Sequence, residues 1–214
     1  MRPKIPALID ALDGRFDTHH SVLGRAIIDH IHFLDRAIAA TSREIATRCE
    51  PFDATIALGC TIPGVKRTTA EIFLAETGGD MTRHPSAGAL AAWAGLAPAS
   101  HESAGKRRPA GTRQGARWLR RALVESAWAA SRTKDTYLGA QYRRLTRRRG
   151  PQKANIAVAH SIIVAAWTML TSGSVYEDLG VDWFDKRSDH SAETRRLVQR
   201  LEYLGLSVTI TPAA

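Results

Sequence analysis

The feature that most constrains the fold is a long helical pattern near the N-terminus. Its apolar stripe consists of Ile27, Ile31, Leu34, Ile38 and Ile45. Steps of four, three, four and seven residues are the spacing of a heptad stripe. Thr41 interrupts the stripe and Pro51 ends the segment, so we predict one helix over residues 21–50. The stripe either packs on its own domain or pairs as a coiled coil with a second subunit or another domain, and the pattern does not choose between these.

The remaining patterns predict shorter helices and no βαβ alternation. We expect helices at 86–94, 113–131, 136–149, 153–171 and 190–204. Residues 206–210 alternate and predict at most a short C-terminal strand. The sequence therefore predicts a mainly α protein, with a helical connector over residues 1–55 and a compact helical domain over 56–214. Residues 153–171 are mostly apolar, but they include Asn155, His160 and Ser161, which favours a buried core helix over a membrane span.

Positive charge is concentrated in one part of the chain. The 214 residues carry a net charge of +9, whereas residues 101–150 alone hold 14 Lys and Arg against 3 Asp and Glu. A local excess of this size is typical of a site for a polyanion, and nucleic acid is the expected partner. Cys49 and Cys60 have no metal-ligand spacing, and reduced thiols fit a cytoplasmic protein.

A Pro-Gly turn at Ile62-Pro63-Gly64-Val65 precedes an alanine-containing helix. The segment 60–77 resembles a helix-hairpin-helix module, in which backbone N–H groups at a helix N-terminus bind phosphate without reading sequence. Gly64 supplies the special backbone conformation of the turn. Lys66 and Arg67 add positive charge, so we expect these three residues to contact nucleic acid.

A loop rich in Gly, Pro, Ser and Arg spans residues 95–112 and contains Ser103. Lys106, Arg107 and Arg108 follow that serine and are suited to holding a phosphodiester. Ser103 is then a candidate nucleophile that would hold the cut strand covalently, with His101 as a candidate proton acceptor. The same residues would also suit a loop that grips phosphate without any reaction.

Two basic helical segments follow the loop over residues 113–150. The cations that we expect to contact phosphate on them are Arg113, Arg117, Arg120, Arg121, Arg143, Arg144, Arg147 and Arg148. Their helical spacings gather them into stripes, and guanidinium groups are well suited to phosphate.

Several of these motifs occur together in one family. The ordered motifs are Ile62-Pro-Gly-Val, Gly95-Leu-x-Pro, Glu102-Ser-Ala-Gly-Lys, a basic Gly-x-x-x-Leu-Arg helix at 115–120, Thr133-Lys-Asp-Thr-Tyr-Leu and Gln141-Tyr-Arg-Arg-Leu. In this order they resemble the C-terminal Tnp domain of the IS110 (IS116/IS902) insertion-sequence transposases, which are DEDD-type, bridge-RNA-guided recombinases. The resemblance extends from about residue 5 to the C-terminus.

The resemblance implies a role in DNA transposition. It implies that Ser103 attacks DNA, with Ser100 as the neighbouring alternative, and that the partners are DNA and a structured guide RNA. It also implies a homo-oligomer formed through the N-terminal helix. Family members bind Mg²⁺ in an N-terminal RuvC-like domain, which we expect to be missing here. The chain would then hold no cofactor and no metal of its own, and would be inactive alone.

Two other functions remain open at this point. The first is a non-catalytic basic α-helical module whose whole role is to bind nucleic acid. The second is a dimerisation adaptor built on residues 21–50.

Overall fold

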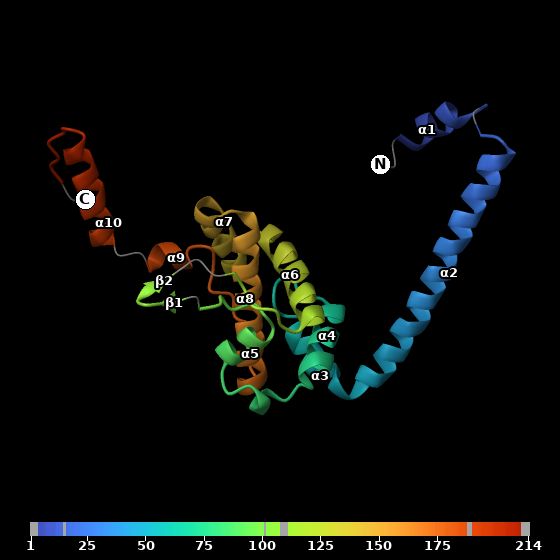
Figure 1. The fold of residues 1–214 in the computed structure, drawn as a ribbon, viewed down its shortest axis with the longest axis horizontal. Coiled ribbons are helices and arrows are strands. Elements are labelled where there is room, and N and C mark those ends of the chain that lie inside the picture. The colour runs from blue at the N-terminus through green and yellow to red at the C-terminus, as the bar shows by residue number, and fades with distance from the viewer. Residues whose placement is uncertain (1–3, 15, 101, 108–110, 188–189, 211–214) are drawn as a thin grey trace. The chain divides into compact units, whose positions relative to one another are not determined.

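The computed structural model describes residues 4–14, 16–100, 102–107, 111–187 and 190–210. The chain divides into two compact units, Met1–Phe52 and Asp53–Ala214, whose elements are labelled in Figure 1. The described residues are mainly helical, and this confirms the predicted mainly α class.

The first unit contains α1 (Ile5–Leu12), α2 (Thr18–Cys49) and the 3₁₀ turn η2 (Glu50–Phe52). Asp17 caps α2, because its side chain accepts a hydrogen bond from the backbone N–H of His20 at 3.0 Å. The predicted helix at 21–50 is thus confirmed, with a start three residues earlier. Neither α1 nor α2 contains a buried residue.

The second unit is built from short helices and one small hairpin. Its elements are α3 (Asp53–Gly59), α4 (Arg67–Thr77), η3 (Met81–Arg83), α5 (Ala87–Trp93), β1 (Glu102–Ser103), β2 (Lys106–Arg107), α6 (Arg117–Arg132), α7 (Tyr137–Arg149), α8 (Pro151–Ser172), α9 (Trp183–Lys186) and α10 (His190–Tyr203). Among the described residues, the only sheet is the two-stranded pair β1–β2.

Helix α8 lies at the centre of this unit. It packs against α5, α6 and α7, and α6 also packs against α4 and α7 (Figure 1). Its Val158, Ile162 and Ile163 are at most 1% exposed and meet Leu119 and Leu123 of α6 in one core cluster. Burying side chains of this size stabilises the fold by about 1.5–3 kcal/mol each. Within the described chain, α8 is the one helix long and apolar enough to cross a membrane, and these contacts explain its composition as that of a core helix.

Two polar contacts tie α8 to its neighbours. The buried Asn155 donates from Nδ2 to the carbonyl oxygen of Val124 on α6 at 3.0 Å. Trp167 donates from Nε1 to the carbonyl oxygen of His84 at 3.1 Å. Because a buried polar group costs free energy unless it is hydrogen-bonded, each contact favours one register of packing.

Two sequence predictions differ from the structure. Residues 206–210 do not form the predicted strand: the backbone N–H of Leu206 bonds instead to the carbonyl of Leu201 at 3.1 Å, and Gly205 has a φ of +83°. This closes the C-terminus of α10. The helix predicted from residue 113 begins only at Arg117. The reason is that the backbone N–H of Ala116 bonds to the carbonyl of Trp93 at 3.2 Å, so residues 113–116 run along α5.

The Pro-Gly turn between α3 and α4 packs directly on α6. Gly64 has a φ of +85°, and a Cβ built on it would lie 2.6 Å from the backbone nitrogen of Ala130. Gly173 provides a comparison, because its φ is +69° and a Cβ there would meet nothing within 4 Å.

We expect Gly64→Ala to destabilise the protein more than Gly173→Ala. Both substitutions force alanine into the left-handed region, at about 1–2 kcal/mol. Gly64→Ala also forces the Pro-Gly turn away from α6, which adds about 1–3 kcal/mol. Urea unfolding measures the difference, and equal midpoints for the two variants would contradict the close contact.

Candidate nucleic-acid interface

The serine loop, residues 95–116, begins and ends at one point of the core. Gly95 and Gly115 approach so closely that a Cβ on Gly95 would lie 2.8 Å from the carbonyl oxygen of Arg113 and 3.0 Å from the nitrogen of Gly115. Further out, Pro98 and Thr112 form a β-bridge, and the N–H of Ala99 bonds to the carbonyl of Gly111 at 2.9 Å. The loop is therefore closed at its base, and Gly95 and Gly115 are both needed there because a Cβ on either would collide with backbone.

Ser103 lies beside a tight turn in a small antiparallel hairpin. Ser103 pairs with Lys106, and Glu102 pairs with Arg107. The two residues between them, Ala104 and Gly105, have φ values of +50° and +72°, as in the two-residue turn that matches strand twist. Directly paired residues project to the same face, with Cβ atoms about 5 Å apart. The Ser103 hydroxyl and the Lys106 ammonium thus share one face of the hairpin.

The hairpin is exposed. Both Ser103 and Lys106 are open to solvent, so a phosphodiester has access to the hydroxyl. No described residue forms a hydrogen bond with the Oγ of Ser103. His101, Arg108 and the side chain of Arg107 lie outside the described part of the structure, and their predicted roles stay predictions.

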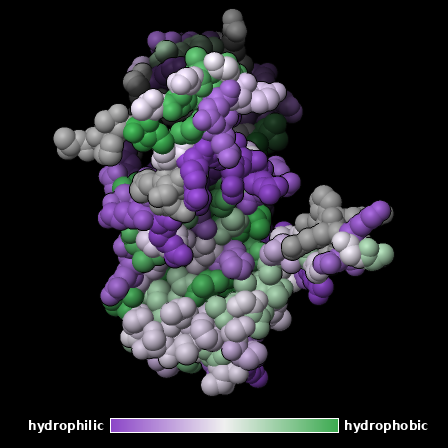
Figure 2. All heavy atoms as spheres, turned by 90° about the vertical axis from the view of Figure 1, so that its left-hand side faces the viewer, coloured by the Kyte–Doolittle hydropathy of each residue, from purple (hydrophilic) through white to green (hydrophobic). Residues whose placement is uncertain are grey.

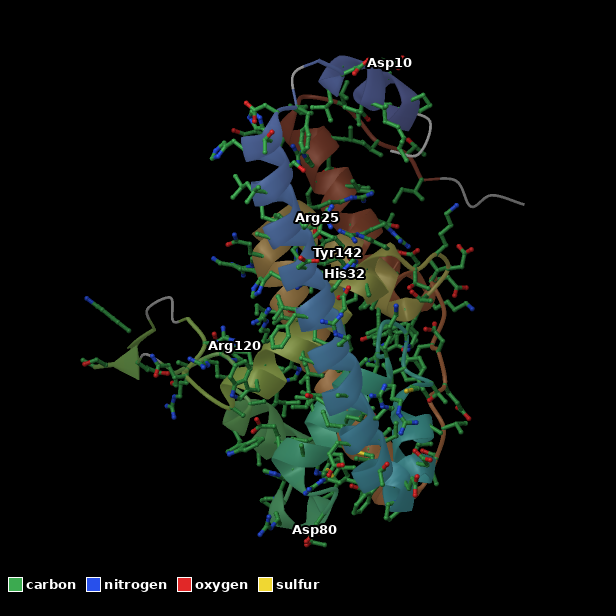
Figure 3. All side chains as sticks on the ribbon, turned by 90° about the vertical axis from the view of Figure 1, so that its right-hand side faces the viewer. Asp10, Arg25, His32, Asp80, Arg120 and Tyr142 are labelled. Carbon is green, nitrogen blue, oxygen red and sulfur yellow. The ribbon has the colours of Figure 1, made fainter. Side chains whose placement is uncertain are left out.

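Arg120 fastens the loop to α6. Its Nη2 donates to the Oγ1 of Thr112 at 2.8 Å, and its Nη1 donates to the carbonyl oxygen of Arg113 at 3.4 Å. Figure 3 labels this side chain where the hairpin-bearing loop leaves the helices. Arg120 is partly buried and has this structural role, and its predicted contact with phosphate stays a prediction.

The other cations on this part of the chain are exposed. Arg113 precedes α6, Arg117 begins it, and Arg121 follows one turn later. The Arg117 guanidinium lies 4.7 Å from the centre of the Trp118 ring, and Trp118 is 56% exposed. Arg121 pairs with Glu125 at 3.0 Å, and an exposed pair of this kind is weak enough to exchange for phosphate.

Four arginines of α7 line an open hollow of about 440 Å³ beside α9. They are Arg143, Arg144, Arg147 and Arg148, and Val181, Phe184 and Asp185 complete its walls. The Arg144 guanidinium lies 4.9 Å from the centre of the Phe184 ring. Tyr137 stacks on the same ring at 5.1 Å, so an aromatic cluster supports α9 against α7. Phe184 is only partly exposed, so the four arginines, rather than the ring, are the groups that suit a nucleic-acid backbone here.

Hydrophilic side chains extend over one side of the molecule in a broad zone, above a paler lower region (Figure 2). Tyr142, labelled in Figure 3, packs its ring on Trp128 with centres 5.7 Å apart. That tyrosine therefore contributes to the packing between α6 and α7.

The Pro-Gly turn is held by contacts within the protein. Gly64 faces the backbone of α6, and Arg67 bonds to Asp53 at 2.9 Å and to Glu71 at 2.8 Å. The hydrogen bonds to Asp53 and then to Glu71 raise the pKa of Arg67, which stays charged but has two carboxylates as partners. Lys66 is exposed and caps no backbone group with its side chain. Phosphate binding at this turn remains a prediction.

Three features of this surface were not predicted as parts of the site. Trp118 beside Arg117 was visible as an aromatic within a basic stripe. Phe184 was not recognisable, because α9 and α7 are brought together only by the fold. The hairpin itself was hidden, because Ala104 is not a usual residue for a turn of this type.

Across the described residues, no three His, Cys, Asp or Glu side chains are grouped so that they could hold a metal ion. Because Mg²⁺ is often held by only one or two carboxylates together with substrate phosphates, the expectation that this chain holds no metal of its own stays a prediction.

One segment of the chain matches a known protein family. Residues 58–143, which run from the Pro-Gly turn through the serine loop into α7, match the Transposase IS116/IS110/IS902 family. The family resemblance inferred from the motifs is confirmed for this segment.

The chain is also similar to a curated protein, the putative transposase y4pF/y4sB of Sinorhizobium fredii (strain NBRC 101917 / NGR234). The two are 34% identical over 120 residues, which is 54% of this chain and 31% of that relative. The comparison thus spans under a third of the relative's length.

We expect Arg120→Met to loosen the base of the serine loop. The substitution removes two hydrogen bonds of about 1 kcal/mol each, so amide exchange at Ala99 should speed up about tenfold or more. Hydrogen exchange followed by NMR measures it. Arg121→Met, one residue along the same helix, is the control and should leave that amide unchanged. Equal exchange in both variants would show that Arg120 does not hold the loop.

Proposed function

We propose that this chain is a segment of an insertion-sequence transposase that grips DNA and supplies Ser103 for strand exchange. The observation that carries the proposal is the hairpin, which presents an exposed serine and a lysine side by side on a loop anchored to a basic helix. The family match over residues 58–143 supports DNA transposition as the process.

The proposed step is a transesterification. The Oγ of Ser103 attacks the phosphorus of a DNA phosphodiester, a Ser–O–P bond forms, and the P–O bond to the leaving deoxyribose oxygen breaks. The serine proton leaves to solvent, and the leaving oxygen gains one. Attack by a hydroxyl of a second strand then reverses the chemistry and releases Ser103, so the number of phosphodiester bonds is conserved.

The cations near Ser103 would bind different phosphates of the DNA strand. Lys106 lies close enough to hold a non-bridging oxygen of the same phosphate and to stabilise the developing charge. Arg113, Arg117 and Arg121 would hold neighbouring phosphates along α6, where they position the strand without reading its bases. Ion pairing with phosphate makes such binding fall steeply with salt.

The arginines of α7 would hold a second length of nucleic acid. Arg143, Arg144, Arg147 and Arg148 gather in a separate hollow beside α9. Through the family resemblance, a structured guide RNA is the expected occupant. The resemblance also implies that acidic residues of a RuvC-like domain complete the active site. It implies a cytoplasmic location as well.

We expect Ser103→Ala to abolish a covalent protein–DNA adduct while leaving DNA binding intact. The full chain, alone and with the acidic domain of a family member added, is incubated with labelled DNA and run on a denaturing gel. Ser100→Ala is the matched control, because Ser100 is also exposed on the same loop. It should retain the adduct.

The binding and adduct readouts separate the alternatives. Salt-dependent DNA binding with no adduct under any condition would favour the non-catalytic basic module. An adduct lost in Ser100→Ala and retained in Ser103→Ala would shift the nucleophile to Ser100. Absence of DNA binding would overturn the proposal as a whole.

The first unit would serve assembly. The stripe residues of α2 are 41–63% exposed, namely Ile27, Ile31, Leu34, Ile38 and Ile45. Apolar side chains repeated in heptads along a 32-residue helix gain free energy when a second such helix covers them. The proposed partner is another copy of this chain.

We expect the double substitution Ile31→Ser with Ile38→Ser to reduce the molar mass in solution to that of one chain. Sedimentation equilibrium measures it. Asp29→Ser with Arg36→Ser is the matched control, because these exposed residues have the same seven-residue spacing on another face. It should leave the assembly intact, and equal masses for both pairs would contradict pairing through the stripe.

A further inference from the structure

A second hollow, of about 360 Å³, lies at the base of the serine loop. Leu96, Pro98 and Thr112 form its loop side, and α7 and α8 form the other. Pro98 and Thr112 are the two residues of the bridge that closes the loop. Ser103 is five positions after Pro98, so the serine lies within about 18 Å of this hollow. Its volume falls at the lower end of the roughly 300–1,000 Å³ typical of small-ligand sites.

The walls of this hollow are largely apolar. Ile156 and Ala157 of α8 lie opposite the loop residues Leu96 and Pro98. Ala157 is partly exposed, so its small side chain leaves part of the space open. Apolar walls suit the faces of an aromatic heterocycle.

A few polar groups join these walls. The Nε2 of Gln141 donates to the Oγ of Ser161 at 2.9 Å. The Oε1 of the same carboxamide is shielded from solvent and accepts no hydrogen bond from any described residue. A shielded acceptor without a donor is costly, and rotation of this carboxamide towards the hollow would let a ligand N–H group satisfy it.

His160 and Lys153 also line the hollow. Half-burial lowers the pKa of His160, so at neutral pH its ring is uncharged and offers one N–H donor and one acceptor. Lys153 is exposed and can pair with a phosphate. A nucleotide matches these three features better than a purely apolar or purely anionic ligand. Its base suits the apolar faces and the hydrogen-bonding groups, and its phosphate suits the cation.

We propose that this hollow receives one base of the DNA strand held at the serine loop, turned out from its neighbours. The inference rests on the proposed function, because the strand at Ser103 supplies the nucleotide. The base would lie between Pro98 and Ala157 near the Gln141 carboxamide, while Lys153 holds its phosphate. Capture of a base would fix the strand in register with the serine, which phosphate contacts alone do not do.

The test compares two single-stranded 12-mers that carry the same phosphates. One has all its bases, and the other is abasic at every position. We expect the full chain to bind the complete strand about 5- to 100-fold more tightly. Ala157→Leu, which fills the hollow, and Gln141→Met, which removes the carboxamide, should both reduce this ratio towards one and leave the affinity for the abasic strand unchanged.

Two control variants distinguish the hollow from the surface around it. Gln152→Leu enlarges apolar volume on the same helix at an exposed residue outside the hollow and should retain the preference. Trp118→Ala tests stacking on the exposed indole. A preference lost in Trp118→Ala and retained in both hollow variants would overturn the proposal.

A measurement on the unaltered chain covers the case in which a variant fails to fold. A single 2-aminopurine is moved along the 12-mer, and its emission should rise at one position, where the base leaves the stack. The base site alone would be contradicted by salt-dependent binding with equal affinity for both strands and by an emission profile that is the same at every position. Failure to bind either strand would contradict the proposed function itself.

Discussion

The close approach of Gly95 and Gly115 is the contact on which the functional surface depends. It joins the end of α5 to the start of α6, and any side chain at either glycine would collide with backbone. A loop whose ends are pinned has far fewer conformations to lose when it binds a ligand. Because the bridge at Pro98 and Thr112 and the Arg120 hydrogen bonds add to this contact, the hairpin is a positioned element of the helical domain.

The arginines predicted to bind nucleic acid are of two kinds. Arg120 and Arg67 bond to groups of the protein itself, so their charge helps to hold the loop and the Pro-Gly turn. Arg143, Arg144, Arg147 and Arg148 line an open hollow, and Arg113 and Arg117 are exposed. Net charge therefore overstates the number of phosphates that this surface can neutralise. The slope of affinity against salt concentration measures how many of the exposed arginines pair with phosphate.

Helix positions could be predicted well from the sequence, since apolar spacing, Pro51 and the glycine-rich loop mark most boundaries directly. The exposed serine and its neighbouring lysine were also within reach, because they lie in one short motif. The role of Arg120 was not, since its partners Thr112 and Arg113 return to it only through the folded loop. The pairing of α9 with α7, and the hollow that joins residues 96–112 to α8, likewise depend on contacts between distant residues. Residues 206–210 show a case in which a local pattern predicts too much structure. Alternation indicates a strand only where another strand is available to pair with it.

The length of the hairpin turn has a consequence for how this sequence can vary. Side chains alternate between the two faces of a strand, so Ser103 and Lys106 share a face only because two residues separate them. An insertion or deletion of a single residue at Ala104 or Gly105 would rotate one member of the pair to the opposite side, even if every amino acid of the motif were retained. Homologous chains that use this hydroxyl together with this ammonium group should therefore vary in the identity of the two turn residues and remain invariant in their number.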